Sequence, residues 1–298
     1  MDLLLGTFIL RPYVFGFLVA FLLAGTVDLG WRRTLLFGAW VGPLAWLSEF
    51  SSTRTGIPFG LYHYTGTTRG QELFIADVPM MDSLSFTFLT YAAFCLSRAV
   101  LRRQRVSPAT LALVSGVLMM LLDVVIDPIA VRGDRWFLGR IFYYPDGGVY
   151  FGVPLSNFGG WMILGAAGVG GYLLWSRWTD RNSRRSARVE TGSISPAGGR
   201  AAPRGGGGMD RSPGSALEGE AGRLTGWGAA AFDRYGRRVW PGIALYYAVL
   251  AFNLVVTGWI GEWRLLMVGT ALHAVTAVVL VNLGLRPAAR WGLEKQRA

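Results

Sequence analysis

The sequence predicts an all-α membrane protein, a polytopic bundle of about seven transmembrane helices. The chain of 298 residues is 52% hydrophobic and only 16% charged, with a mean hydropathy of +0.38. Soluble domains usually carry more charge than this. Seven apolar segments also have the roughly 17–25 residues that a helix needs to cross a bilayer. The basic residues gather in every second connection between these segments, as expected for a membrane bundle.

The seven spans follow one another with recognisable breaks. A short turn with Arg32 and Arg33 separates the first two spans, and an arginine cluster separates the third span from the fourth. The third and fourth spans contain polar residues, and a long polar connection follows the fifth. The spans lie near residues 8–25, 34–50, 78–100, 108–129, 154–176, 239–258 and 264–284.

Arginine and lysine are unevenly divided between the two sides that seven spans create. The turns after spans one and three, the connection after span five and the C-terminal tail hold 22 of the 29 Lys and Arg residues. Cytoplasmic connections carry such an excess. We therefore expect an outside N-terminus, a cytoplasmic C-terminus and a place in the cytoplasmic (inner) membrane. The net charge of +11 follows from this asymmetry, so we expect membrane lipid as a partner and no nucleic acid.

The segment 180–232 interrupts the apolar pattern because it is rich in Gly, Ser, Pro and Arg. Such a composition has little to bury and predicts a disordered cytoplasmic linker, although its arginines could also contact anionic lipid. We expect residues 1–179 to form a membrane domain with spans one to five and the candidate site. Residues 233–298 then add spans six and seven to the same bundle.

Four carboxylates lie inside or at the ends of the apolar segments. Glu49 and Asp82 flank the connection after span two, and Asp123 and Asp127 close span four. In the predicted topology all four, with Asn157 at the start of span five, lie in the outer layer of the membrane. Asp123 and Asp127 share a helix face because they are four residues apart. Ionisable groups at membrane depth are costly, so they are candidates for function.

Two loops, 55–66 and 140–154, cover this layer in the predicted topology. They are rich in Gly and Tyr, and Trp161 follows the second loop. Tyr and Trp also gather at membrane interfaces for structural reasons, and the carboxylates could pair with Arg54, Arg132 or Arg135. As substrate-binding candidates we take Phe59, Tyr62, His63, Tyr64, Tyr150 and Trp161.

The residue inventory narrows the chemistry. The chain has only two histidines and one cysteine, Cys95, so a histidine-rich di-iron centre and a thiolate metal site are not expected. No G-x-G-x-x-G follows a strand, and no serine nucleophile elbow is present. We therefore expect no metal and no cofactor. Buried carboxylic acids can act as general acids, and aromatic faces stabilise cations. Together they suit protonation of an alkene in a lipid-soluble substrate and capture of the cation by water.

Three runs resemble the carotenoid-biosynthesis membrane proteins of the CruF type. They are W-L-S-E-F-S-S-T-R-T-G-I-P-F-G-L-Y-H-Y-T (46–65), L-D-V-V-I-D-P (122–128) and Y-F-G-V-P-L-S-N-F-G-G-W (150–161). The resemblance covers spans two to five. It implies a cofactor-independent hydratase, a hydro-lyase that adds water across the terminal C1–C2 double bond of an acyclic carotenoid. It also implies a carotenoid substrate, with other enzymes of the carotenoid pathway as partners.

In this hypothesis Asp123 or Asp127 protonates C2, and Glu49 or Asp82 orients the water that adds at C1. Asn157 holds that water or a carboxylate. The rings of Tyr62, Tyr64 and Trp161 line the site of the cation.

Three other functions remain open on the sequence. The D-V-V-I-D run matches the D-x-x-x-D of membrane prenyltransferases, although no second such motif is present. A carotenoid cyclase would use the same protonation and then lose a proton. A proton-coupled transporter would use the carboxylate layer with further ionisable residues across the membrane, where spans six and seven offer only Asn253, His273 and Asn282.

Overall fold

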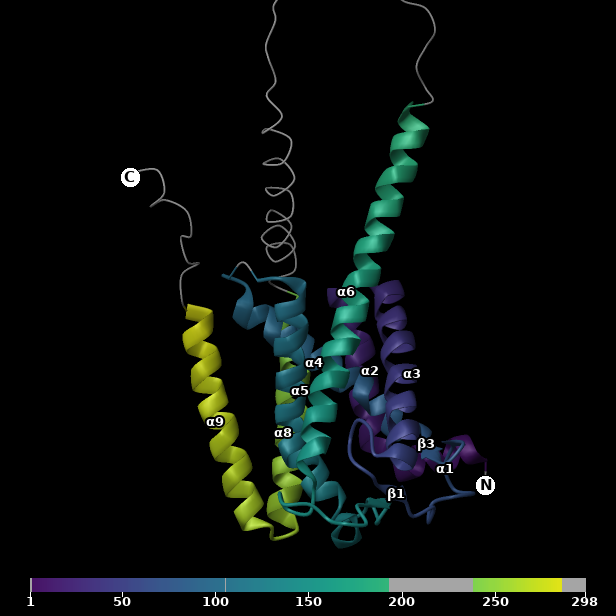
Figure 1. Ribbon diagram of the computed structural model, residues 1–298, viewed down its shortest axis with the longest axis vertical. Coiled ribbons are helices and arrows are strands. Elements are labelled where there is room, and N and C mark those ends of the chain that lie inside the picture. The colour runs from purple at the N-terminus through teal and green to yellow at the C-terminus, as the bar shows by residue number, and fades with distance from the viewer. Residues whose placement is uncertain (1, 105, 193–237, 286–298) are drawn as a thin grey trace, which may run out of the picture.

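Helices make up most of the structure, a computed structural model that describes residues 2–104, 106–192 and 238–285, with only the backbone at 180–192 (Figure 1). Eight α-helices and four strands of two residues each are present in this part of the chain, which confirms the all-α class. The helices are α1 (Leu3–Leu10), α2 (Pro12–Asp28), α3 (Trp31–Thr55), α4 (Met80–Leu101), α5 (Pro108–Ala130), α6 (Leu155–Gly192), α8 (Trp240–Trp259) and α9 (Trp263–Leu285). The strands are β1 (His63–Tyr64), β2 (Phe74–Ile75), β3 (Val78–Pro79) and β4 (Phe142–Tyr143), and a 3₁₀ turn spans Gly133–Arg135.

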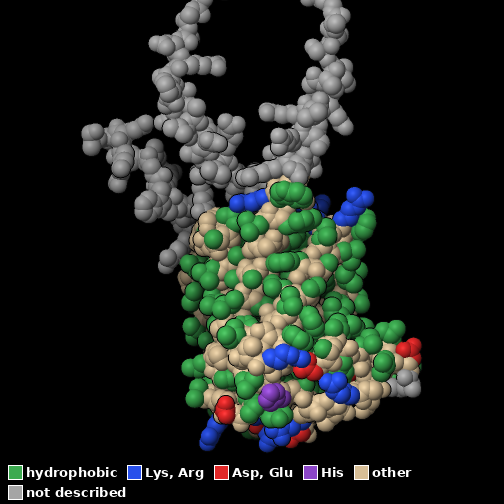
Figure 2. Space-filling view, turned by 45° about the vertical axis from the view of Figure 1, so that its right-hand side comes forward, with side chains coloured by type: hydrophobic (Ala, Val, Ile, Leu, Met, Phe, Trp, Pro, Cys, Tyr) green, Lys and Arg blue, Asp and Glu red, His purple; other side chains and the backbone are tan. Residues whose placement is uncertain are grey.

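The predicted spans fall on these helices. Five of the described helices, α4, α5, α6, α8 and α9, are long and apolar enough to cross a membrane, and the pair α1–α2 would make a sixth span. Helix α3 has 25 residues and carries Arg32, Arg33, Glu49 and Arg54 among its apolar side chains. Hydrophobic side chains cover the middle of the face in Figure 2, and charged side chains lie towards its two ends. The count of seven spans and their orientation stay predictions.

The first predicted span, near residues 8–25, is broken at Arg11. Helices α1 and α2 meet there at an angle of 90°. Pro12 is the first residue of α2, and proline disfavours a helical conformation of the residue before it. Arg11 accordingly has φ −125° and ψ 45°. The corner places the Arg11 side chain in the protein interior, where it is 1% exposed.

Helix α4 is central and packs against α2, α3, α5, α6, α8 and α9. Helices α5 and α6 make a particularly close contact, for which Gly116 is responsible. A Cβ atom at Gly116 would lie 2.2 Å from the carbonyl oxygen of Met162, so only glycine permits this approach. Helix α9 lies at the edge of the bundle (Figure 1).

A buried ion pair joins α2 to α4. This pair was not predicted from the sequence. Arg98 donates hydrogen bonds to both carboxylate oxygens of Asp28, and the Tyr91 hydroxyl donates to Asp28 at 3.1 Å. Asp28 is 1% exposed. Removal of one partner from such a pair would leave an uncompensated buried charge.

The two loops that were predicted to share one face meet through β1 and β4. These strands pair antiparallel, with His63 opposite Tyr143 and Tyr64 opposite Phe142. The loops lie at the same end of the bundle as α1, and the C-terminal part of α6 projects from the opposite end (Figure 1). We refer to the first of these ends as the loop end.

Helix α6 continues past the predicted end of its span near residue 176. Its helical backbone reaches Gly192 and so includes the first residues of the predicted linker, 180–232. The rest of that linker lies outside the described residues, and its predicted disorder stays a prediction.

Candidate active site

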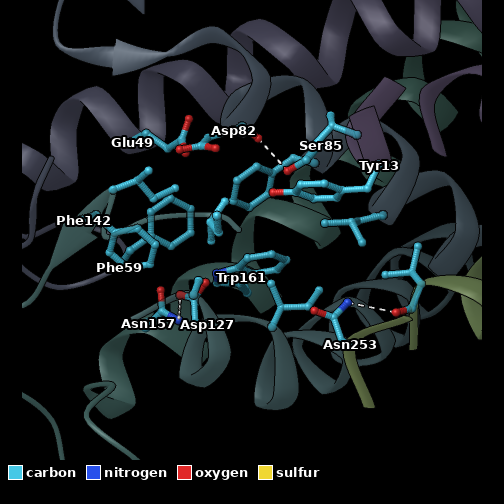
Figure 3. A pocket seen from close by; sticks show the side chains of 18 of the residues that line it. Tyr13, Glu49, Phe59, Asp82, Ser85, Asp127, Phe142, Asn157, Trp161 and Asn253 are labelled. Carbon is cyan, nitrogen blue, oxygen red and sulfur yellow. Dashed lines mark hydrogen bonds between the residues drawn. The ribbon is translucent and has the colours of Figure 1, made fainter. Parts of the chain in front are cut away.

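Near the loop end, α2, α3, α4, α5, α6 and α8 surround a cavity of about 140 Å³ (Figure 3). An apolar cavity of ~150 Å³ in another protein holds one benzene molecule, so this cavity is suited to a group of roughly six carbons. Most of its lining is apolar or aromatic, and a smaller set of polar side chains is placed among these residues. The polar side chains that line it include Glu49, Tyr62, Tyr64, Asp82, Ser85, Asp127, Tyr144, Asn157 and Asn253.

One wall of the cavity carries Glu49 from α3 and Asp82 from the first turn of α4 (Figure 3). Glu49 is 4% exposed. The Ser83 hydroxyl donates a hydrogen bond to Glu49 Oε2, and the Tyr64 hydroxyl donates to Glu49 Oε1 at 3.0 Å. Burial, followed by the charge of Glu49, raises the pKa of Tyr64 well above its usual value. The Tyr64 hydroxyl therefore stays protonated and remains a donor.

The opposite wall carries Asp127 and Asn157, which form a cluster with Asp123. The Nδ2 atom of Asn157 donates to Oδ2 of Asp123 and to Oδ2 of Asp127, at 2.7 Å each. The Tyr144 hydroxyl lies 3.4 Å from Asp127 Oδ2. Asp123 is fully buried, and its Oδ1 atom has no hydrogen-bond partner in the described part of the chain. One amide group from α6 thus bridges two acids from α5.

The arginines that could have neutralised these carboxylates have other partners. Arg54 pairs with Asp77 at 2.9 Å, and both Arg132 and Arg135 pair with Glu262. Among the described residues, no ion pair joins Arg, Lys or His to Glu49, Asp82, Asp123 or Asp127. Arg54, Arg132 and Arg135 therefore do not pair with the four carboxylates of the candidate site.

Aromatic rings fill the space around the two walls. Trp161 packs against Phe86 with ring centroids 4.5 Å apart, and Phe59 lies 5.8 Å from Phe86. Tyr62 makes edge contacts with Tyr64 and with the loop residues Phe142 and Tyr144. These rings surround the cavity, and a ring that presents its face to the cavity can stabilise a positive charge within it.

Comparison with known proteins identifies the family to which the chain belongs. The sequence profile of the family described as "Carotenoid biosynthesis protein" matches residues 3–194. The chain belongs to this family. The match includes the site residues of both walls. It ends before α8, which contributes Val249, Phe252 and Asn253 to the cavity.

A curated protein similar to this chain is "Bisanhydrobacterioruberin hydratase" of Haloarcula japonica. It is 31% identical to this chain over 167 residues, which are 56% of this chain and 51% of the relative. The matched region thus spans about half the length of the relative. No solved structure matches this carotenoid biosynthesis protein.

The structure brings together most, but not all, of the predicted site residues. Glu49, Asp82, Asp127 and Asn157 line the cavity, as do Phe59, Tyr62, Tyr64 and Trp161. Asp123 does not line the cavity. It is connected to the cavity through Asn157, which also binds Asp127. His63 is exposed on β1 against Tyr143. Tyr150 packs on Phe158, with its hydroxyl buried outside the cavity.

Several residues of the site were missed on the sequence. Ser83 and Tyr144 bind the carboxyl groups directly, and Phe86 and Phe142 supply rings. Ser83 follows Asp82 in the sequence, so its position could have suggested it. Tyr144 is one of the tyrosines of the second loop that were expected to cover the carboxylates, but it was not among the substrate-binding candidates. In the described chain, no three His, Cys, Asp or Glu side chains are grouped as metal ligands. The absence of a cofactor remains a prediction.

Proposed function

We propose that this carotenoid biosynthesis protein is a hydratase that adds water across the terminal C1–C2 double bond of an acyclic carotenoid. The observation that carries the proposal is the cavity with carboxyl groups on two opposite walls and aromatic rings between them (Figure 3). Its volume suits the five carbons of one isoprene unit and not a whole carotenoid. The end of the substrate would enter the cavity, and the rest of the polyene would lie outside it.

The cluster of Asp123, Asp127 and Asn157 supplies the acid in this proposal. Two carboxyl groups that share one amide donor without a cation cannot both be ionised at low cost. A proton held between them is available to the substrate through Asp127, which faces the cavity. Transfer of this proton to C2 leaves a tertiary cation at C1. The rings of Trp161 and Tyr62 lie where they can stabilise that charge.

The opposite wall supplies the water. Glu49, Asp82 and Tyr64 offer acceptors and a donor at the surface of the cavity, which are the groups that hold and orient a water molecule. The water oxygen bonds to C1, and one of its protons passes to a carboxylate. The product is a tertiary alcohol, and one water has been added in total. A cyclase would also need an acceptor for the proton that it loses, so hydration is favoured over cyclisation by the similarity of the chain to a curated hydratase.

The prenyltransferase and transporter alternatives have less support. The two aspartates of D-V-V-I-D are bound to Asn157, and the nearby arginines Arg132 and Arg135 pair with Glu262. Neither Arg132 nor Arg135 is therefore available to neutralise the charge of a diphosphate bound at these aspartates. His273 and Asn253 bind backbone carbonyl groups of Leu121 and Val249, as expected for interhelical and intrahelical contacts and not for a proton relay.

Expression in a lycopene-producing host tests the proposal. Mass analysis of the extracted pigments should show a product heavier than the substrate by one water, or by two if both ends react. A product with unchanged mass and a ring at its end would indicate a cyclase. Unchanged lycopene, with the protein present in the membrane, would contradict the proposed function for this substrate, and a longer acyclic carotenoid should then be supplied.

A further inference from the structure

The cavity extends away from the acid cluster towards α2 and α8. In Figure 3, Phe59, Phe142 and Asn157 lie on one side of the cavity, whereas Tyr13 and Asn253 lie on the other. Helix α2 lines this second side with Tyr13, Val14 and Phe17, and α8 lines it with Val249, Phe252 and Asn253. A terminal isoprene at the acid cluster would therefore direct the rest of its chain towards α2 and α8.

Specific contacts close several other sides of the cavity. The hydrogen bond between Ser83 and Glu49 joins α4 to α3, and the pairing of β1 with β4 covers the loop end. A Cβ atom at Gly160 would lie 2.5 Å from the Phe59 ring, so α6 packs directly on the first loop. The Tyr246 hydroxyl of α8 donates to a backbone carbonyl of α5 at 2.9 Å. A chain that passed on these sides would break a hydrogen bond or displace backbone.

The contact between α2 and α8 beside the cavity is made by aromatic rings. Tyr13 stacks on Phe252, with ring centroids 5.3 Å apart and an interplanar angle of 16°. Phe17 meets the same ring edge-on at 5.8 Å. All three side chains are half-buried. A conjugated hydrocarbon chain can replace these ring contacts with contacts of the same kind, because both are sums of many weak attractions between carbon atoms.

Small side chains follow these rings along both helices. Ala20 comes three positions after Phe17 in α2, and Ala248 comes four positions before Phe252 in α8, so each alanine shares a helix face with its ring. Ala248 is exposed, and Ala20 is half-buried. Helix α2 begins at the loop end and α8 ends there (Figure 1), so both alanines lie deeper in the bundle than the rings. They leave room for a chain that runs from the cavity along α2 and α8.

The substrate class requires such a route. Conjugated double bonds resist rotation, so a polyene cannot fold back within a cavity of about 140 Å³, and its apolar chain belongs in the hydrocarbon layer. Resting on the proposed hydratase function, we infer that the end of an acyclic carotenoid enters the cavity between Phe17 and Phe252. The rest of the polyene lies along the outer surface of α2 and α8, past Ala20 and Ala248.

Fluorescence quenching tests this path without turnover. A small thiol-reactive fluorophore is attached at Ala248→Cys in the full-length protein in lipid vesicles, where the natural cysteine, Cys95, is buried. Lycopene is then titrated, because a carotenoid quenches fluorophores at short range. The reference is Ile163→Cys, which is 59% exposed on α6 and lies close in sequence to the cavity residue Trp161. We expect saturable quenching at Ala248→Cys and only weak, non-saturating quenching by dissolved lycopene at Ile163→Cys.

A second experiment blocks the path from outside. Ala248→Trp places a large side chain beside Phe252, and the matched control Ala274→Trp places the same side chain at an exposed position of α9. We expect Ala248→Trp to lower kcat/KM for hydration by about tenfold or more, because small displacements of the reacting atoms cost much of the rate. Ala248→Leu should give an intermediate loss, and Ala274→Trp should leave the rate unchanged.

The two experiments separate the path from the proposed function. Quenching at Ala248→Cys that does not saturate, or that is no stronger than at Ile163→Cys, would overturn the inference. Hydration by Ala248→Trp at the wild-type rate would also overturn it, and Ala248→Leu decides if the tryptophan variant does not reach the membrane. Saturable quenching at Ala248→Cys without any hydrated product would contradict the hydratase and leave the path standing.

Discussion

Asn157 Nδ2 lies 2.7 Å from Asp127 Oδ2, although the two residues belong to different helices and are 30 positions apart in the sequence. The same nitrogen binds Asp123 at 2.7 Å. This contact depends on the close approach of α5 and α6, which Gly116 permits. It joins into one unit three side chains that the sequence predicted to lie in the same layer of the membrane.

Replacement of the acid that protonates the substrate should stop the reaction without unfolding the protein. A carboxamide preserves the shape of the side chain but cannot donate the proton that an alkene requires. We expect at least one of Asp127→Asn and Asp123→Asn to lower product formation by about a hundredfold or more, because general acids contribute roughly 10²–10⁴. Asp127 faces the cavity, so its variant should have the larger effect. Pigment analysis at matched membrane expression measures this, and near wild-type rates in both variants would make the acid cluster structural.

Tyr64 should affect activity through its hydroxyl group. Tyr64→Phe keeps the ring and removes the donor to Glu49, so we expect a loss of about tenfold in rate, which corresponds to about 1.4 kcal/mol and is typical of one lost hydrogen bond. Tyr143→Phe is the matched control, because Tyr143 lies on β4 with its side chain exposed and outside the cavity. Equal effects of the two substitutions would argue against a role for the Tyr64 hydroxyl.

Trp161 should stabilise the cation and so affect the rate more than the binding of substrate. Trp161→Phe retains an aromatic face beside Phe86 and should keep much of the activity. Trp161→Leu retains apolar bulk without that face, and we expect kcat to fall by roughly fivefold to thirtyfold, the equivalent of about 1–2 kcal/mol of cation–π stabilisation. Similar KM values for both variants would support this role. An equal loss of kcat in Trp161→Phe and Trp161→Leu would indicate a packing role instead.

The predicted orientation can be checked by labelling from the two sides of the membrane. Cysteines introduced at Thr67, in the loop between α3 and α4, and at Ser193, after α6, should react with a membrane-impermeant reagent from opposite sides, Thr67 from outside. Cys95 is buried and should contribute little background. Labelling of both positions from one side would overturn the predicted topology, whereas opposite sides with Thr67 inside would invert the orientation alone.

The sequence by itself determined the helical class, the approximate places of the helices and the candidate carboxylates. These follow from local properties: apolar length, the spacing of Asp123 and Asp127, and the rarity of charge in apolar segments. The resemblance of the three runs, now supported by the family match over residues 3–194, indicated the biosynthetic class. The partners of the carboxylates could not be predicted in the same way, because one apolar helix can face its neighbours in many rotations.

Only the tertiary structure decided which candidates share one cavity. His63 and Tyr150 belong to the same loops as Tyr64 and Tyr144, yet the pairing of β1 with β4 directs Tyr64 and Tyr144 inward and leaves His63 exposed. Successive residues of a strand point to opposite sides, so neighbours in the sequence have different environments. The burial of Arg11 also required the bend before Pro12 and the distant Glu72. The pairing of β1 with β4 and the Arg11–Glu72 ion pair both join residues that are far apart in the chain. They form only when the whole fold brings these segments together.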